Sequence, residues 1–176
     1  WSPDGREVIF AMRGSLWRQA LGTTIATQLT AGPGYDHQPD WSPDGKRVAF
    51  VRYDHDAMEL ASLELATGIV TPLTQGGAVN VEPRWSPDGA RIAFVTTQFE
   101  GRFNVAVLTV GPDGHAGELR RVTPSRDSHL PRYYYSVYDQ YLSPTWSPDG
   151  RELIIISNRG HIWGAGTFHR LAIDAP

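Results

Sequence analysis

The sequence predicts an all-β fold, a β-propeller of about four small four-stranded antiparallel sheets, or blades. The stretch Trp-Ser-Pro-Asp-Gly occurs four times in 176 residues, at Trp1–Gly5, Trp41–Gly45, Trp85–Gly89 and Trp146–Gly150. Each copy precedes a short apolar run that is typical of a buried strand. Successive copies start 40, 44 and 61 residues apart, and tandem units of about 40–45 residues are typical of propeller blades.

The second repeat shows how one unit forms one blade. Four strands are expected, over residues 39–41, 47–53, 59–65 and 69–73. Between the first two, Pro43 suits the second position of a type I turn, and Gly45 accepts the positive φ that follows. The strand over 47–53 is apolar on consecutive residues at its centre, so we expect both of its faces to be covered.

Sheets with two apolar faces are not stable alone in water, and stacking them around an axis covers both faces. The repeated tryptophan is then expected to pack against the neighbouring blade, with a ligand-stacking role as the alternative. Three repeats end a fourth strand with a similar pair, Leu29-Thr30, Leu73-Thr74 and Val122-Thr123. No long helical periodicity is present, so helix should be scarce.

The expected blades cover residues 1–34, 35–78, 79–125 and 140–176, with an insertion loop over 126–142. The first and last blades are incomplete, because the first strand of one and the fourth strand of the other are missing. We therefore expect a segment of a larger propeller or half of an assembled ring. Exposed blade faces would be apolar patches that bind a protein partner or a second copy. Closure of four strained blades, and a missing part of the parent chain at these faces, remain alternatives.

Composition excludes several classes of function. The net charge is −3, which gives no electrostatic basis for binding nucleic acid. No apolar run approaches the roughly 18 residues of a membrane span, and no signal peptide is visible in this chain. Cysteine is absent, which excludes disulfides, zinc–thiolate sites and cysteine nucleophiles.

The insertion between the third and fourth repeats is rich in tyrosine: five of the seven tyrosines lie between residues 125 and 142. Long loops are often functional, and tyrosine suits recognition surfaces. The alternative is a lid packed over one end of the propeller, with the tyrosines half-buried.

Loops that enter the first strands, and loops between the second and third strands, should gather at one mouth of the central channel. Their polar residues are candidates for binding a polar ligand or a divalent cation, with solvated loop residues as the alternative. Together with the insertion they give the candidate ligand-binding set: Asp36, His37, Asn80, Glu82, His129, Arg132, Tyr133, Tyr134, Tyr135 and Arg159.

Catalytic signatures are absent from the sequence. It contains no His-x-His, His-Glu-x-x-His, Gly-x-Ser-x-Gly or phosphate-loop motif. We therefore predict no catalytic residue and no cofactor, apart from the cation that the channel can hold.

The repeated Trp-Ser-Pro-Asp-Gly, followed by Arg-Ile-Ala-Phe in the third copy, resembles the WD40-like (PD40) propeller repeat of the TolB family. Residues 31–39, 128–136 and 157–164 are similar to the TolB-like propeller that precedes an amidohydrolase domain in large bacterial proteins. That resemblance implies a periplasmic or secreted protein whose metal-dependent hydrolysis lies on a separate barrel domain. The barrel's metal-binding histidine motif is absent here.

Three functions follow as hypotheses. The first is a non-catalytic module for protein–protein interaction, or for substrate capture and gating beside a hydrolase domain. The second is a ligand- or metal-binding propeller, with a hydrolytic variant, whose site is the channel mouth. The third is an envelope component similar to TolB. Fold alone does not choose among them.

Overall fold

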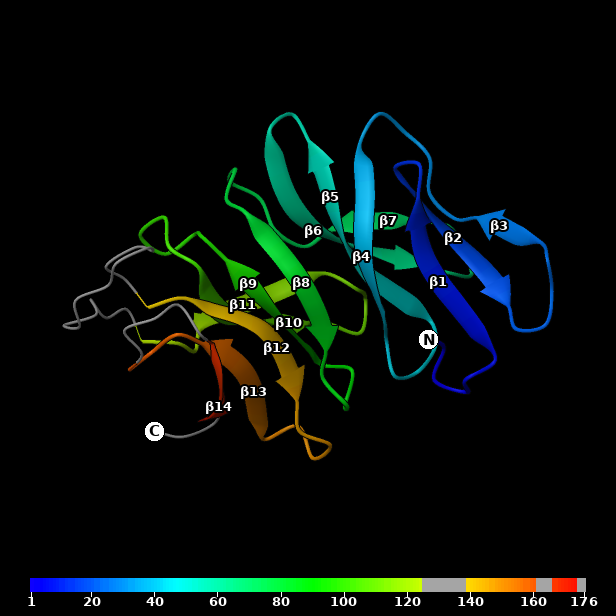
Figure 1. The fold of residues 1–176 in the computed structure, drawn as a ribbon. Helices are drawn as coiled ribbons and strands as arrows, with labels where there is room; N and C mark the ends of the chain where they lie inside the picture. Colours follow the sequence, from blue (N-terminus) through cyan, green and yellow to red (C-terminus); the bar gives the residue numbers. More distant parts are fainter. Residues whose placement is uncertain (125–138, 161–165, 174–176) are drawn as a thin grey trace.

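The computed structural model describes residues 1–124, 139–160 and 166–173. These residues form strands and no helix, in four antiparallel sheets (Figure 1). The predicted all-β propeller fold is confirmed. No helix long and apolar enough to cross a membrane occurs in the described part of the chain.

Each sheet is one blade, and the strands follow one another in sequence order. Blade 1 contains β1 (Glu7–Met12), β2 (Ser15–Ala20) and β3 (Ala26–Gln28). Blade 2 contains β4 (Tyr35–Trp41), β5 (Arg47–Asp54), β6 (Ala57–Glu64) and β7 (Val70–Pro72). Blade 3 contains β8 (Asn80–Trp85), β9 (Arg91–Thr96), β10 (Asn104–Val110) and β11 (Ala116–Arg121). Blade 4 contains β12 (Tyr141–Trp146), β13 (Glu152–Ser157) and β14 (Thr167–Ala172).

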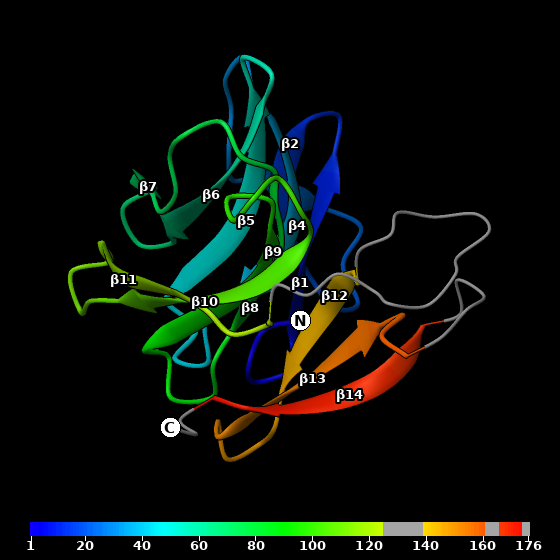
Figure 2. The ribbon, with the colours of Figure 1, turned by 90° about the vertical axis from the view of Figure 1, so that its left-hand side faces the viewer.

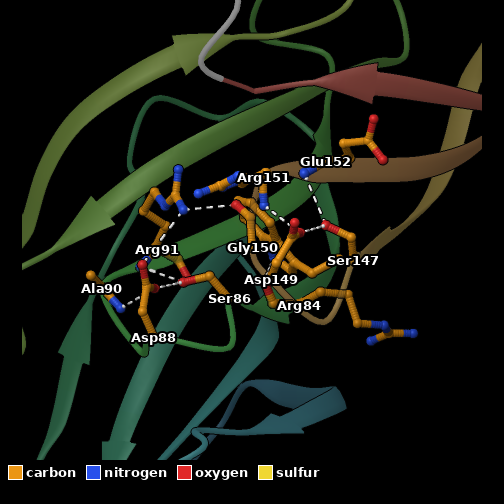
Figure 3. Close-up of polar contacts among 11 residues, drawn as sticks. Arg84, Ser86, Asp88, Ala90, Arg91, Ser147, Asp149, Gly150, Arg151 and Glu152 are labelled. Carbon is orange, nitrogen blue, oxygen red and sulfur yellow. Dashed lines mark hydrogen bonds and ion pairs between the residues drawn. The ribbon is translucent and has the colours of Figure 1, made fainter.

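The turn after each repeated tryptophan is fixed by its own side chains. In blade 3, Ser86 Oγ donates to Asp88 Oδ1 and accepts from the Arg91 amide at 2.9 Å, while Asp88 Oδ1 also accepts from the Ala90 amide (Figure 3). The same serine–aspartate arrangement recurs in the other three turns. Gly89 closes the turn at φ 70°, which an L side chain rarely adopts. The four identical motifs are therefore four identical local structures.

The Leu-Thr and Val-Thr pairs each make the same specific backbone contact. They directly follow the fourth strands, and the buried threonine hydroxyl accepts a backbone N–H from the third strand. The amides of Leu16, Leu60 and Val105 donate in this way to Thr30, Thr74 and Thr123 at 2.9, 2.8 and 3.1 Å. The hydroxyl thus satisfies an amide that the short outer strand leaves unpaired.

Apolar side chains fill three layers, each between two neighbouring blades. Trp41 packs in the layer between blades 1 and 2, Trp85 between blades 2 and 3, and Trp146 between blades 3 and 4. The expected packing of the tryptophan against the adjacent blade is confirmed for these three. Trp1 differs, because it is 75% exposed.

The blades are arranged as an arc. Extensive contacts join β4 to β1 and to β8, and β8 to β12. Within the described residues, no comparable contact joins blade 1 to blade 4, and Figure 1 shows these two blades at opposite ends of the row. Figure 2, turned by 90°, shows β14 on the side of blade 4 away from the other blades. The arc therefore has two end faces.

Candidate functional site

The inner strands β4, β8 and β12 share a β-bulge, which the sequence analysis did not predict. In each strand one extra residue is inserted, for example where His37 pairs with Val51 but Asp40 pairs with Ala49. The bulge residue has positive φ: 51° at Gln38, 57° at Glu82 and 51° at Ser143. Positive φ is uncommon for these residue types. Such strain persists where surrounding structure enforces it.

The bulge residues bond to one another from blade to blade, and we call Gln38, Glu82 and Ser143 the bulge chain. Gln38 Oε1 accepts from the Glu82 amide at 2.8 Å. Glu82 Oε2 accepts from the Ser143 amide at 2.6 Å. The positive φ turns each amide toward the preceding blade, where a side chain receives it. The chain therefore sets the register between neighbouring inner strands.

A second set of contacts lies nearer the turns. Asp40 Oδ2 accepts from the Trp85 amide at 2.7 Å, and the Trp146 indole N–H donates to the Arg84 carbonyl at 2.9 Å. Burial raises the pKa of Asp40, and the Trp85 amide and the Arg84 charge oppose that rise only in part. These groups hold blades together and leave little capacity for a ligand.

Asp36 is held inside blade 2. Its side chain is 3% exposed and accepts from Arg52 Nε at 2.7 Å and from Arg52 Nη2 at 2.9 Å. This bidentate bond to Asp36 raises the pKa of Arg52. A carboxylate paired in this way is an anchor for the guanidinium.

His37 follows Asp36 on the opposite face of β4. Its ring packs against the Tyr35 ring, with centroids 5.9 Å apart. Burial lowers the pKa of His37, and the Asp36 charge opposes this only in part. A neutral imidazole is therefore favoured at neutral pH, which suits hydrogen bonding more than attraction of an anion.

Asn80 is buried, and both polar atoms of its side chain are hydrogen-bonded. Its Oδ1 accepts from Thr96 Oγ1 at 2.7 Å, and its Nδ2 donates to Glu59 Oε2 at 2.9 Å. Glu59 also accepts from the Thr74 hydroxyl at 2.5 Å and from the Gly77 amide at 2.8 Å. This network ties the blade 2–blade 3 connection to β6, so Asn80 has a structural partner for each polar atom.

The remaining candidates divide into two groups. Arg159 is exposed, beyond the end of β13, and its amide donates to Ser157 Oγ. His129, Arg132, Tyr133, Tyr134 and Tyr135 lie outside the described residues, so their ligand-binding role stays a prediction.

The structure corrects the expected position of the segments that precede the tryptophan motifs, which were expected to be loops entering the first strands. The residues 36–38, 80–82 and 141–143 lie within strands β4, β8 and β12 and not in loops. The first strand of blade 2 begins at Tyr35 instead of residue 39, because the bulge at Gln38-Pro39 interrupts the pattern without ending the strand. Among the predicted set, the structure joins Glu82 to its neighbours, but Asp36 and Asn80 are engaged elsewhere.

A cavity of about 290 Å³ lies on blade 2, and Arg52, the ion-pair partner of Asp36, is one of its lining residues. Ala61, Val70 and Pro72 give it an apolar wall, while Arg52, Asp54 and Glu59 supply charge. Asp36 neutralises Arg52, so the two remaining carboxylates leave the cavity acidic. In contrast, no group of three His, Cys, Asp or Glu residues able to hold a metal occurs among the described residues.

Sequence reasoning missed Gln38 and Ser143 as interacting positions, although a signal was present. Each bulge residue stands in the pattern x-Pro-x-Trp, as Gln38-Pro39-Asp40-Trp41 shows. A proline inside a strand marks an edge or a bulge. The pattern repeats three residues before every internal tryptophan and so locates all three bulges.

Repeated four-stranded blades, serine–aspartate turns and bulged inner strands together define a β-propeller repeat protein. A family model described as the TolB beta propeller domain matches residues 1–162. The chain therefore belongs to the PD40 family of TolB β-propeller domains.

Two individual relatives place the chain within this fold. The Tol-Pal system protein TolB of Alcanivorax borkumensis is 34% identical over 56 residues, which are 29% of this chain and 13% of that protein. The structure of TolB from Acinetobacter baumannii superposes with a TM-score of 0.71 at 20% identity, over 98% of this chain and 42% of that one. This chain spans less than half the length of either.

A third similarity is to an enzyme. The puromycin-hydrolyzing peptidase of Mycobacterium tuberculosis gives a TM-score of 0.70 at 20% identity, over 96% of this chain and 28% of the peptidase. At this identity the similarity concerns the fold alone. It does show that a chain called a peptidase contains a region folded like this one.

Proposed function

We propose that the chain is a non-catalytic propeller module that binds protein, and that it captures or gates substrate beside a hydrolase domain. The observation that carries this proposal is a pair of exposed tyrosines that stand opposite each other on β4 and β5, where Tyr35 is 52% and Tyr53 40% exposed. Large aromatic side chains exposed on sheet faces are typical of interaction surfaces.

The engagement of the polar candidates supports the same proposal. Asp36 is bound to Arg52, Asn80 to Glu59, and Glu82 to Ser143. A general base or nucleophile needs a free lone pair aimed at a substrate. Side chains that hold blades together do not provide one, so binding through surfaces is the better use of this scaffold.

Two comparisons support the neighbouring hydrolase domain and the cellular location that we propose. The peptidase with a similarly folded region favours a propeller beside a hydrolase domain, and family membership favours a periplasmic or secreted location. We propose both for the complete protein that contains this chain.

The experiment measures hydrolysis by the complete protein with and without residues 1–176, on one long and one short substrate of the same scissile bond. Removal should change KM for the long substrate and leave kcat for the short one unchanged. Equal effects on both would contradict gating, and a complete protein without hydrolase activity would leave only the interaction role.

Turnover by the isolated chain would contradict the proposal itself. The informative variant is Asp36→Ala with Glu82→Ala. Turnover that this variant loses while it stays folded by circular dichroism would place an active site on the inner strands instead.

The cavity on blade 2 supports a second candidate, a binding site for a small cationic ligand with an apolar body. Its apolar wall and its two carboxylates, Asp54 and Glu59, favour such chemistry. We expect benzylamine to raise Tm and the uncharged benzyl alcohol to have no effect. Val70→Trp should fill the cavity and abolish the shift, whereas the adjacent exposed Ile69→Trp should not. An equal shift with both compounds would contradict the acidic site.

A further inference from the structure

The sequence Pro-Asp-Gly occurs five times, and the tryptophan motif supplies only four of these turns. The fifth, Gly-Pro-Asp-Gly at residues 111–114, joins β10 to β11 and has a glycine where the motif has serine. Its backbone has the same form. The Gly114 amide donates to the Gly111 carbonyl at 2.9 Å, as the Gly89 amide donates to the Ser86 carbonyl. Gly114 has φ 84° and Gly89 has φ 70°. The fifth turn therefore differs from the others chiefly in its side chains.

Two hydrogen bonds hold the aspartate in each of the four motif turns. Asp149 Oδ1 accepts from Ser147 Oγ at 2.6 Å and from the Arg151 amide at 3.1 Å (Figure 3). The serine oxygen is itself fixed, because it accepts the backbone amide five residues later. The same pair of bonds holds Asp4, Asp44 and Asp88.

Asp113, the aspartate of the fifth turn, lacks the serine bond. Among the described residues, its carboxylate accepts only from the His115 amide, at 3.2 Å. A side-chain carbon built on Gly111 would lie 2.5 Å from Asp113 Oδ1, so the carboxylate occupies the space of the absent serine. All five aspartates are exposed. The hydrogen bonds, and not access to water, therefore distinguish Asp113 from the other four.

An aspartate followed by glycine can rearrange its own backbone. The glycine nitrogen attacks the side-chain carboxyl carbon, a C–N bond closes a five-membered succinimide, and the amide hydrogen leaves with the carboxyl hydroxyl as water. Water then opens the ring at one carbonyl to restore aspartate, or at the other to leave isoaspartate. The overall change is an isomerisation that needs no other reactant. Glycine favours it, since it has no side chain to obstruct the attack.

The attack requires the carboxyl group to leave its hydrogen bonds and turn toward the glycine nitrogen. We propose that Asp113–Gly114 is a site of isoaspartate formation in the folded protein, and that the motif serine protects the other four aspartates. One ordinary hydrogen bond corresponds to about a fivefold change in rate. Asp113 should therefore convert at least about fivefold faster than Asp88. This inference is independent of the proposed binding role.

Arg47 gives the modification a structural consequence. Its guanidinium reaches from blade 2 to blade 3 and donates to the carbonyls of Gly111 and Pro112. A carbon built on Gly114 would lie 3.4 Å from Arg47 Cζ. Isoaspartate lengthens the main chain of this turn by one carbon, which displaces the groups that Arg47 contacts. We therefore expect conversion to weaken the contact between blades 2 and 3.

The experiment incubates the folded chain in neutral buffer and follows the five Pro-Asp-Gly sites with time. Liquid chromatography with electron-transfer fragmentation distinguishes isoaspartate from aspartate at unchanged mass. The chain unfolded in urea is the control, because all five sites share the same tripeptide and should then convert at similar rates. Conversion of Asp113 no faster than that of Asp88 in the folded chain would overturn the proposal. So would a preference for Asp113 that persists in urea.

Two reciprocal variants test the role of the serine. Gly111→Ser supplies the missing hydroxyl and should slow conversion of Asp113 about fivefold. Gly111 lacks a positive φ, and the close atom is the end of an exposed side chain, so serine fits once the carboxylate turns. Ser86→Gly should accelerate conversion of Asp88 by a similar factor, while Asp149 in the same chain serves as the reference. An unchanged rate at Asp113 in Gly111→Ser would contradict protection by serine, whether or not Ser86→Gly folds.

Thermal unfolding before and after incubation tests the consequence for the blades. The Tm of the wild-type chain should fall as Asp113 converts, whereas that of Gly111→Ser should fall more slowly. An equal fall in both chains would show that the modification does not reach the Arg47 contact. None of these measurements involves hydrolase activity, so the gating proposal stands or falls separately.

Discussion

The first and third copies of the repeated motif have the same five residues and very different surroundings. Ser2 and Ser86 make the same bonds, each accepting at 2.9 Å from the amide five residues later. Trp85, however, is 7% exposed and Trp1 is 75% exposed. The motif therefore fixes the turn locally, whereas the neighbouring blade determines whether the tryptophan is buried.

The largest expected effect on stability comes from replacing the tryptophan of each copy with alanine. Trp85→Ala should lower the free energy of unfolding by about 3–5 kcal/mol, because it opens a cavity between blades 2 and 3. Trp1→Ala should change it by no more than about 0.5 kcal/mol. Urea denaturation of the two variants measures both values. Equal losses would mean that Trp1 is buried in solution.

Loss of the serine should give the opposite pattern, with similar costs in both copies. Ser86→Ala leaves the Arg91 amide without its acceptor, and Ser2→Ala does the same to the Glu7 amide. Each loss should cost about 1–3 kcal/mol. Urea denaturation measures both. A much smaller loss for Ser2→Ala would show that the turn depends on its neighbour after all.

The threonines after the outer strands extend the comparison to blades 1 and 2. Thr74→Val and Thr30→Val both remove the hydroxyl that accepts a third-strand amide. Each should cost about 1 kcal/mol. Thr74→Val should cost more, because Thr74 also donates to Glu59. Thermal unfolding of the two variants and of Thr123→Val ranks them, and an equal loss would contradict a role for Glu59.

The smallest effect is a pH dependence carried by the turn aspartates. The Ser147 hydroxyl and the Arg151 amide lower the pKa of Asp149, and the equivalent groups lower that of Asp4. The unfolded chain then takes up protons first as pH falls, so this stabilisation is present above about pH 4 and is lost below it. Unfolding between about pH 5 and 3 should show the loss, and Asp149→Asn should flatten the curve. An unchanged slope would contradict the assignment.

Much of the fold could be predicted from the sequence because its signals are local. The turn residues Ser86 to Gly89 satisfy each other within one segment, and the strand after them is apolar on both faces, so four blades follow from pattern alone. The bulge at Gln38 was harder. Its cause is that Gln38, the residue before Pro39, has a left-handed backbone conformation. A residue before proline usually prefers an extended backbone.

The candidate site was less predictable, because the pairing register of the strands determines which hydrogen-bond partner each polar residue meets. The sequence predicts Asp36 as a channel ligand, but β4 and β5 place it opposite Arg52. Asn80 meets Glu59 only after the chain crosses from blade 2 to blade 3. Neither pairing has a spacing that sequence reasoning can recognise.

Pro43 lies against Gly89 and Pro87 against Gly150, since a side-chain carbon built on these glycines would come within 3.3 and 3.6 Å of the two prolines. The turns of neighbouring blades therefore interlock, and an added residue there would force the sheets apart. The long tyrosine-rich insertion stands at another place in the sequence, between β11 and β12. Chains of this kind can thus gain sequence between blades while the turns keep one length.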